Sequence, residues 1–398
     1  MKNKKSIVFL GYGEFPYGFA EVQKIILISK SLIISNNKVT VICRNGYHNS
    51  SERPNLNRSG VYENINYIYA SGSVFRNKNF LRRRINHVKG RINEILLLRN
   101  YKKRKELDYA ILSTRNFYSI VYYSILSKLF KFKTILNYVE YYSAMEKGKF
   151  QISKKINDTL FDRLAPSISD AVFPISEFLI EQTKRVSPYK NYLKIPGLTD
   201  FDNYKGIETL NIEKYFLFCG HAAYKEIIYF IIDSYSLLKS NSVKLYLVIN
   251  GDQEDLNSIK EYALMKDPSK KINIYSKLSQ KELFTYYYNA LALLIPLRPT
   301  FQDIARFPHK TGEYLASGNP VISTNYGEVK NYFTDGENML LAEAYDIYLF
   351  AEKMEYAISN PQEVKEIGLK GKNVAIKLFD YRYKAQEIDD FLNSVLTD

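Results

Sequence analysis

The chain has 398 residues, 46% of them hydrophobic and 25% charged, which is typical of a soluble globular protein. This length exceeds one ordinary hydrophobic core, so two domains are expected rather than one. The net charge of +14 favours anionic partners such as nucleic acid, anionic lipid or phosphorylated ligands, and no apolar run is long enough for a transmembrane helix.

The N-terminal segment and the cysteines indicate a cytoplasmic protein. The apolar stretch in MKNKKSIVFLGYG is too short for a signal peptide. Cys43 and Cys219 lie in apolar runs, so we expect buried, reduced thiols. Their spacing predicts no metal site.

The first half of the chain begins like a doubly wound parallel sheet. Residues 6–10 predict a buried strand that ends at a glycine loop, followed by a helix over 19–34 and a strand over 38–43. Further strands are predicted at 65–69, 109–112, 133–138 and 171–174. The loop GYGEFPYG is either a plain turn or a ligand loop in which Gly13 and Gly18 let the backbone approach a phosphate. Its spacing is not the dinucleotide fingerprint, so a hydride-transfer enzyme is not expected.

Residues 76–105 form a strongly basic segment with apolar residues at helical spacing. The apolar positions are Ile85, Val88, Ile92, Ile95 and Leu96. Such a basic amphipathic helix is typical of a membrane-surface element. The alternative is a solvated charged face over a stripe that packs on the core.

A second α/β pattern follows a Pro- and Gly-containing stretch at 194–207, which reads as a linker. Strands are predicted at 215–219, 244–249, 271–275, 291–296 and 319–323, and helices at 226–238, 281–289, 310–317, 345–358 and 381–396. We therefore expect domains at 1–200 and 207–380, with the helix near 381–398 packing back on the first domain. Two such domains form a cleft, and ligands bind beyond the carboxyl ends of parallel strands.

The candidate donor-site residues follow the strands of the second domain. Gly220 and His221 end the first strand, Lys225 stands near the next helix and can reach a diphosphate, and Gly251 follows the second strand. In FPHKTGEYLASGNPVIST, Lys310 and Glu313 occupy one face of the first turns of a helix. A lysine there can bind phosphate, and a carboxylate can accept two hydrogen bonds from a ribose. The alternative is a surface ion pair.

The second half resembles the retaining glycosyltransferases of the GT-B fold, glycosyltransferase family four. GEYLASGNPVIST, from Gly312 to Thr324, matches the latter part of the family's Glu-x7-Glu motif, and FPHK resembles its FPxK variant. FLFCGHAAYKE, LVINGD and the first-half loop GYGEFPYGFAEVQKI resemble other family segments. The resemblance implies two Rossmann-like domains facing each other across a cleft, with Glu313 on ribose and Lys225 and Lys310 on phosphate. It also implies a donor-site position for Phe307.

The sequence departs from the family at the first glutamate of this motif, which falls on Ala305. Asp303 lies two residues earlier and is our candidate substitute. Glu140, after a predicted strand, is the candidate for the first-domain group near the reacting sugar. The catalytic candidates are thus Glu140, Asp303, Lys225 and Lys310.

The resemblance implies a metal-independent transferase that needs no cofactor and uses a nucleotide diphosphate sugar as donor. We expect a glycan or lipid-linked acceptor in bacterial capsule or lipopolysaccharide biosynthesis, and a cytoplasmic protein bound peripherally to an anionic membrane through residues 76–105. No nucleic-acid motif is present, so no nucleic-acid partner is expected. The alternatives are a nucleotide-sugar epimerase of the same fold and an inactive basic scaffold.

Overall fold

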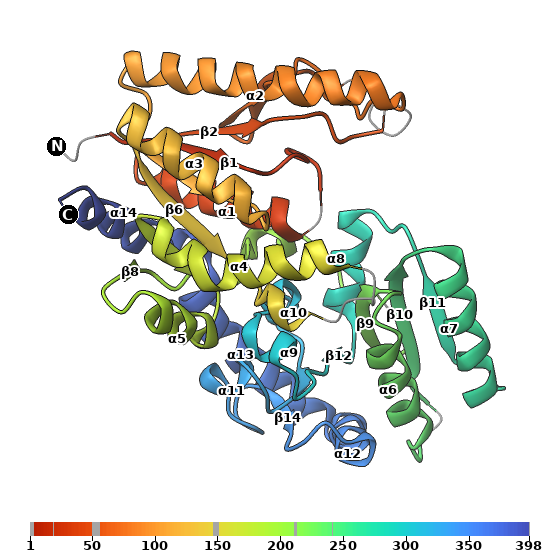
Figure 1. Ribbon diagram of the computed structural model, residues 1–398. Helices are drawn as coiled ribbons and strands as arrows, with labels where there is room; N and C mark the ends of the chain where they lie inside the picture. The colour runs from red at the N-terminus through yellow and green to blue at the C-terminus, as the bar shows by residue number, and fades with distance from the viewer. Residues whose placement is uncertain are drawn as a thin grey trace. The chain divides into compact units, whose positions relative to one another are not determined.

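A computed structural model describes residues 4–18, 20–49, 56–145, 151–210, 213–240 and 242–397. The chain divides into two compact units (Figure 1). The first unit combines Met1–Leu198 with Tyr381–Asp398, and the second unit is Thr199–Asp380. The N-terminal unit is therefore completed by the last helix of the chain.

The first unit is built on an eight-stranded sheet in which all neighbouring strands are parallel except the pair β3 and β4. Its order is β3-β4-β2-β1-β5-β6-β7-β8. The strands are β1 (Ser6–Leu10), β2 (Lys38–Cys43), β3 (Ser59–Tyr62), β4 (Ile65–Tyr69), β5 (Tyr109–Leu112), β6 (Lys133–Tyr138), β7 (Ala171–Pro174) and β8 (Asn191–Tyr192). Because β2 and β5 lie on opposite sides of β1, the topological switch point of this sheet is at β1.

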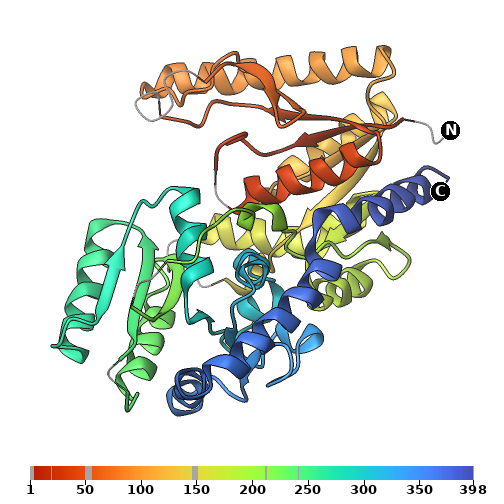
Figure 2. The ribbon, with the colours of Figure 1, turned by 180° about the vertical axis from the view of Figure 1, so that it is seen from behind.

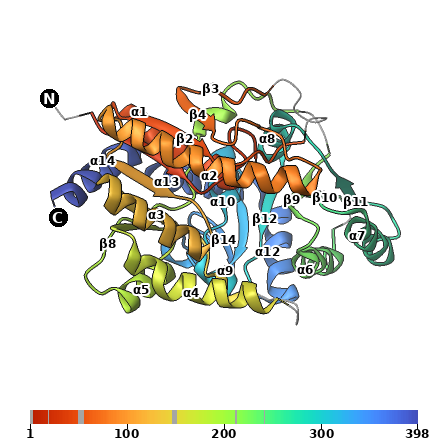
Figure 3. The same cartoon turned by 45° about the horizontal axis from the view of Figure 1, so that its top comes forward.

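Helices cover both faces of this sheet. They are α1 (Ala20–Ile34), α2 (Phe80–Lys103), α3 (Phe117–Phe130), η1 (Tyr142–Ala144), α4 (Ile152–Ile168), α5 (Glu177–Val186) and α14 (Tyr381–Thr397). The predicted start of α1 at Phe19 lies outside the described residues. Helices α1 and α14 pack side by side (Figure 2), and α2 contacts α3 (Figure 3).

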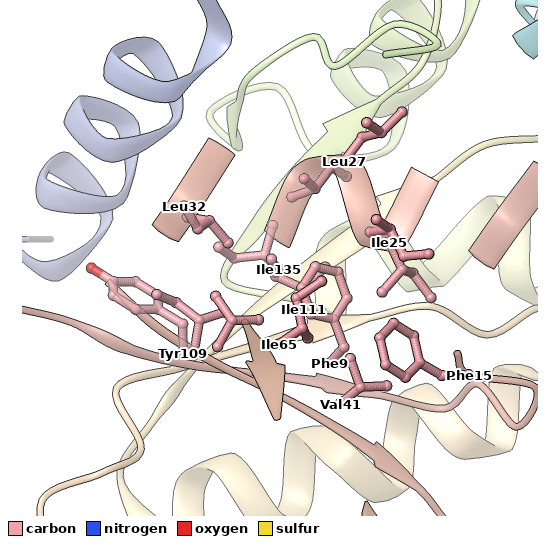
Figure 4. Packing of buried hydrophobic residues seen from close by; sticks show 14 of the residues in the cluster. Phe9, Phe15, Ile25, Leu27, Leu32, Val41, Ile65, Tyr109, Ile111 and Ile135 are labelled. Atoms are coloured by element: carbon pink, nitrogen blue, oxygen red, sulfur yellow. The ribbon is translucent and has the colours of Figure 1, made fainter. Parts of the chain in front are cut away.

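The core of the first unit joins three parts of the chain. Phe9, Ile111 and Ile135 from the central strands meet Ile25 and other residues of α1 (Figure 4). Three residues of α14 complete the same cluster, namely Ile388, Leu392 and Val395.

A buried polar contact fixes α14 on this core. Lys5 Nζ lies 2.8 Å from Asp389 Oδ1, and Asn37 Nδ2 donates to the same oxygen at 2.7 Å. Both members of the Lys5–Asp389 ion pair are buried, so removing either would leave a buried charge without compensation.

Helix α2 faces the first unit with the side opposite its stripe of exposed apolar residues. Its buried residues are Gly90, Glu94 and Leu98, whereas Ile85, Val88 and Ile92 are 64%, 59% and 53% exposed. The alternative of a core-packed stripe is therefore wrong for these residues, although Ile95 is half-buried. No helix in the described part of the chain is long and apolar enough to span a bilayer.

A buried network anchors the polar side of α2. Arg44 Nε donates to Glu94 Oε2 at 2.9 Å, and Arg44 Nη2 donates to the Tyr123 hydroxyl at 2.8 Å. That hydroxyl donates to Glu94 Oε1 at 2.9 Å. A Cβ on Gly90 would lie 2.5 Å from the Arg44 carbonyl oxygen, so only glycine allows the helix this close to the chain after β2.

The second unit contains a six-stranded, fully parallel sheet in the order β11-β10-β9-β12-β13-β14. The strands are β9 (Tyr215–His221), β10 (Lys244–Asn250), β11 (Ile272–Tyr275), β12 (Ala292–Ile295), β13 (Val321–Thr324) and β14 (Leu340–Ala342). The helices are η2 (Phe201–Tyr204), α6 (Lys225–Ser236), α7 (Gln253–Lys266), α8 (Gln280–Asn289), α9 (Phe301–Ala305), α10 (His309–Ser317), α11 (Val329–Tyr332), α12 (Ile347–Ser359) and α13 (Pro361–Phe379). Helix α12 packs on α6, and α13 packs on α10.

The stretch at 194–207, predicted as a linker, contains the division between the two units after Leu198 and is partly buried. Residues 195–199 are buried, and η2 follows them. Thr199 N–H donates to the Phe379 carbonyl at 2.8 Å. Pro and Gly break regular structure here, but the segment still belongs to packed protein.

Candidate functional site

The switch point of the second sheet lies between β9 and β12. The chain leaves β9 for β10 on one side and later adds β12 on the other side. Since all strands are parallel, their carboxyl ends share one edge, where open α/β sheets bind ligands. Helix α6 follows β9 at this edge, and α9 and α10 follow β12.

Two of these helices begin without a side-chain cap. The N-cap residues, Tyr224 of α6 and Pro308 of α10, provide no side-chain cap hydrogen bond. The neighbouring α7 is capped by Asp252, which accepts from Asp255 N–H at 2.9 Å. Uncapped helix N-termini offer N–H donors and a positive dipole end to an anion.

Lys310 and Glu313 lie in the first turns of α10, as the sequence predicts. Burial raises the pKa of Glu313 to about 7, and the charge of Lys310 acts in the opposite direction. Glu313 Oε1 lies 3.5 Å from His309 Nε2, and its carbonyl accepts from the Tyr204 hydroxyl at 2.5 Å. The carboxylate is thus held in a partly desolvated position beside a cation.

The residues after β9 and β10 adjoin each other. A Cβ on Gly251 would lie 2.5 Å from Ala222 Cβ, so this position requires glycine. Gly220 and His221 end β9, and His221 Nδ1 accepts from Ala223 N–H at 3.1 Å. Lys225 begins α6, and its Nζ lies 2.6 Å from Asp255 Oδ1. A phosphate that binds Lys225 must therefore compete with Asp255.

Asp303 is fully buried between two arginines. Its Oδ2 accepts from Arg298 Nε at 2.9 Å, and its Oδ1 lies 2.7 Å from Arg306 Nη2. Arg298 also reaches Glu226 Oε2 at 2.9 Å. Hydrogen bonding to Asp303 raises the pKa of Arg298 further above its ordinary value. These contacts place two guanidinium groups after β12.

Two further predicted positions are buried near Asp303. Ala305, where the family motif has its first glutamate, is buried at the end of α9. Phe307 is buried and its ring centroid lies 5.0 Å from that of Phe379. Phe307 therefore supports the segment that leads into α10.

The remaining candidates belong to the first unit. Gly13 lies in the loop after β1, and a Cβ on Gly18 would lie 2.4 Å from Val22 Cγ2. Glu140 comes two residues after β6. Burial, together with the carboxylates of Glu21 and Glu140, raises the pKa of Tyr142.

Sequence reasoning missed the arginine pair and the partner of Lys225. Arg298 follows the apolar run ALLIPL, so a cation placed just beyond a strand was an available signal. Asp255 gave no such signal, because its pairing with Lys225 depends on how α6 and α7 pack.

The sequence and the fold of this chain were compared with those of known proteins. Residues 200–374 match the model of the family glycosyl transferases group 1. A search of curated proteins found no match to the sequence. Sucrose-phosphate synthase from Thermosynechococcus elongatus has a TM-score of 0.77 at 14% identity, over 99% of this chain and 100% of that one.

Two other solved structures show the same likeness. Alr3699/HepE from Anabaena in complex with UDP-glucose has a TM-score of 0.69 at 12% identity, over 98% of this chain and 100% of that one. The lipopolysaccharide outer core galactosyltransferase WaaB has a TM-score of 0.61 at 15% identity, over 99% of each chain. The chain thus has the GT-B fold of glycosyltransferases, and its second unit carries the region that matches the group 1 family.

Proposed function

We propose that this protein is a retaining glycosyltransferase. It moves a sugar from a nucleotide diphosphate sugar to a hydroxyl of a growing glycan. The observation that carries the proposal is the placement of Lys310 and Glu313 together in the first turns of helix α10, whose N-cap Pro308 gives no side-chain cap, after the strand beside the switch point of the second sheet. HepE was solved with UDP-glucose, which supports the same ligand class here.

In the proposed donor complex, the ionised Glu313 accepts hydrogen bonds from the two vicinal hydroxyls of the ribose. Lys310, Lys225 and the N-terminal N–H groups of α6 and α10 bind the diphosphate and offset its charge as it leaves. Gly220, His221 and Gly251 leave room at this edge for the nucleotide. Asp303 acts by holding Arg298 and Arg306 in place.

The proposed chemistry is a front-face substitution without a metal. The bond between the anomeric carbon and the diphosphate oxygen breaks, and the acceptor oxygen bonds the same carbon on the same face. The acceptor proton passes to the leaving phosphate oxygen. Among the first-unit groups, the proposal assigns Glu140 to the reacting sugar and the loop with Gly13 and Gly18 to the diphosphate of the donor.

The proposal places the reaction at the cytoplasmic face of an anionic membrane, on a lipid-linked acceptor. The exposed apolar stripe of α2 (Ile85, Val88, Ile92 and Leu96) is surrounded by basic residues, and Glu94 is the only acidic residue of that helix. This pattern favours binding parallel to a membrane surface. The likeness to WaaB supports a role in cell-surface glycan assembly.

The test is nucleotide binding by thermal shift and calorimetry with UDP, GDP, ADP and CMP. We expect one diphosphate to raise the melting temperature of the wild type, and this gain to be lost in Glu313→Ala. Glu261→Ala, at an exposed position on α7, is the matched control and keeps the gain. No response to any nucleotide would refute the proposal. If the protein is given a nucleotide sugar without an acceptor and converts the sugar into its epimer, this product would instead indicate an epimerase.

A further inference from the structure

A pocket of about 480 Å³ lies within the first unit, at the carboxyl edge of its sheet. Its walls come from the segments after β1, β2 and β4 and from α2 and α3. Gly13, Arg44 and Tyr47 line it from the segments after β1 and β2, and Arg76, Arg83 and His87 line it from the segment after β4 and from α2. The pocket adjoins β1, the switch point of this sheet, and the donor candidates of the second unit take no part in it.

The pocket carries positive charge that the surrounding protein does not neutralise. Arg44 is paired with the buried Glu94. Arg76 and Arg83 form no ion pair within the ranges that the structure describes. Glu14, in the loop after β1, accepts a hydrogen bond from the Tyr12 hydroxyl at 3.2 Å, and its hydrogen bond and charge also raise the pKa of Tyr47. Two guanidinium groups therefore remain available for an anion.

The polar groups beside these arginines are hydrogen-bond donors as well. Asn45 Nδ2 lies 3.0 Å from His87 Nδ1, an arrangement in which the neutral ring keeps its proton on Nε2. Burial and the neighbouring arginines lower the pKa of His87, which keeps the ring neutral. Asn77 and Asn86 add amide groups to the lining. Guanidinium forks and amide donors in one concave site match the oxygens of a phosphate.

The position of the pocket on α2 relates it to the exposed apolar stripe. Arg83, Asn86 and His87 line the pocket from the same turns that carry Ile85 and Val88 outside. A phosphate held at a membrane surface would therefore be within reach of the pocket when the stripe contacts lipid. The two unpaired guanidinium groups carry two positive charges. They therefore match a doubly charged phosphate better than they match a singly charged carboxylate ligand.

We infer that this pocket binds a phosphate group of the acceptor, so that the enzyme selects phosphorylated acceptors through Arg76 and Arg83. The assignment of this phosphate to an acceptor molecule rests on the proposed function, whereas the anion site itself rests on the pocket alone. The phosphate belongs either to a lipid or to a soluble glycan, and both sources present the same chemistry to the two arginines.

The test uses the full chain with UDP present at saturation, so that the donor site is filled. Pyrophosphate binding is measured by calorimetry, and lipid binding by co-sedimentation with phosphatidylcholine vesicles that contain phosphatidic acid. The variant is Arg76→Gln with Arg83→Gln. The control is Arg82→Gln with Arg99→Gln, which removes the same charge from exposed positions of α2 outside the pocket.

We expect the pocket variant to bind at least one probe about tenfold more weakly than the control does, with unchanged UDP affinity. A loss with vesicles alone assigns the phosphate to a lipid, and a loss with pyrophosphate alone assigns it to a soluble molecule. Equal binding of both probes by the two variants would overturn the inference while leaving the proposed function intact. Failure to bind any of the four nucleotides, with pyrophosphate binding still dependent on the two arginines, would overturn the proposed function and retain the phosphate site.

Discussion

The substitution Glu313→Gln is expected to stabilise the protein above neutral pH. Burial raises the pKa of this carboxyl group from its ordinary value of 4.5 to about 7. Because the folded-state pKa lies above the unfolded one, the protonated form contributes stability that is complete below about pH 4.5 and is lost as the pH rises through 7. At about 1.4 kcal/mol for each pKa unit, ionisation lowers the free energy of unfolding by about 3 kcal/mol.

Glutamine has nearly the same shape and never ionises, so it escapes this loss. Thermal and urea unfolding of the wild type and the variant would be compared from about pH 5 to about pH 8.5. The difference in unfolding free energy should be small at the acid end and grow to about 3 kcal/mol, a rise in melting temperature of about 6 to 12 °C. Glu261→Gln, on the exposed side of α7, should show a difference that does not change with pH.

The same substitution should weaken nucleotide binding. At about pH 8 the variant loses charge-assisted hydrogen bonds to the ribose, which corresponds to a roughly ten- to hundredfold loss in UDP affinity by calorimetry. As the pH falls below 7 the wild-type carboxylate takes up a proton, so the gap should narrow. A stability difference independent of pH, or equal UDP affinity at the higher pH, would refute the reasoning about a buried, ionised Glu313.

Three further predictions concern stability and membrane binding. Glu94→Ala leaves the Arg44 guanidinium without its buried partner and should lower the unfolding free energy by about 3 to 5 kcal/mol in urea titrations, whereas an unchanged midpoint would contradict the network. Gly251→Ala forces a methyl group to within 2.5 Å of Ala222 Cβ; we expect a loss of about 1 to 3 kcal/mol with weaker UDP binding, checked by unfolding and calorimetry. Val88→Ser alters an exposed side chain, so the unfolding free energy should change by less than about 0.5 kcal/mol while co-sedimentation with anionic vesicles falls; unchanged co-sedimentation would contradict membrane contact.

Much of the sheet architecture could be predicted because buried parallel strands are short, continuous apolar runs. The predicted strands at 6–10, 38–43 and 133–138 coincide with β1, β2 and β6. Strands β3 and β8 gave no comparable signal, since β3 is almost wholly exposed and β8 has two residues. The three-residue strand β14 was missed as well, although it is buried, whereas the edge strand β11 was predicted at 271–275. Pattern reasoning therefore misses strands that are exposed or only two or three residues long.

The direction of a helical stripe could not be predicted. Periodicity shows that Ile85, Val88 and Ile92 share one side of α2, but it does not say whether that side is buried. The buried side of α2 is the one opposite the apolar stripe, where Gly90 permits close contact and Glu94 forms an ion pair with Arg44. Glu94 is the lone glutamate among many basic residues of this helix, and only the three-dimensional contacts show that it is the anchor.

The candidate site also has features that the sequence predicts and features that it does not. Lys310 and Glu313 could be placed on one helix face because their spacing is local. The engagement of Lys225 by Asp255 depends on how α6 and α7 pack and had no sequence signature. Asp303 lies within five residues of both Arg298 and Arg306, so its contacts are local, but their charges alone did not show that they pair.

The return of α14 to the first unit has a consequence for biosynthesis. When the ribosome has made the first 198 residues, the nascent chain still lacks Ile388, Leu392 and Val395, which complete that unit's core. The buried Lys5 also waits for Asp389, its partner 384 positions later in the chain. The usual order of vectorial folding, in which the N-terminal domain matures first, is thereby reversed. The second unit contains all of its own strands and can finish folding while the first is still held open for its final helix.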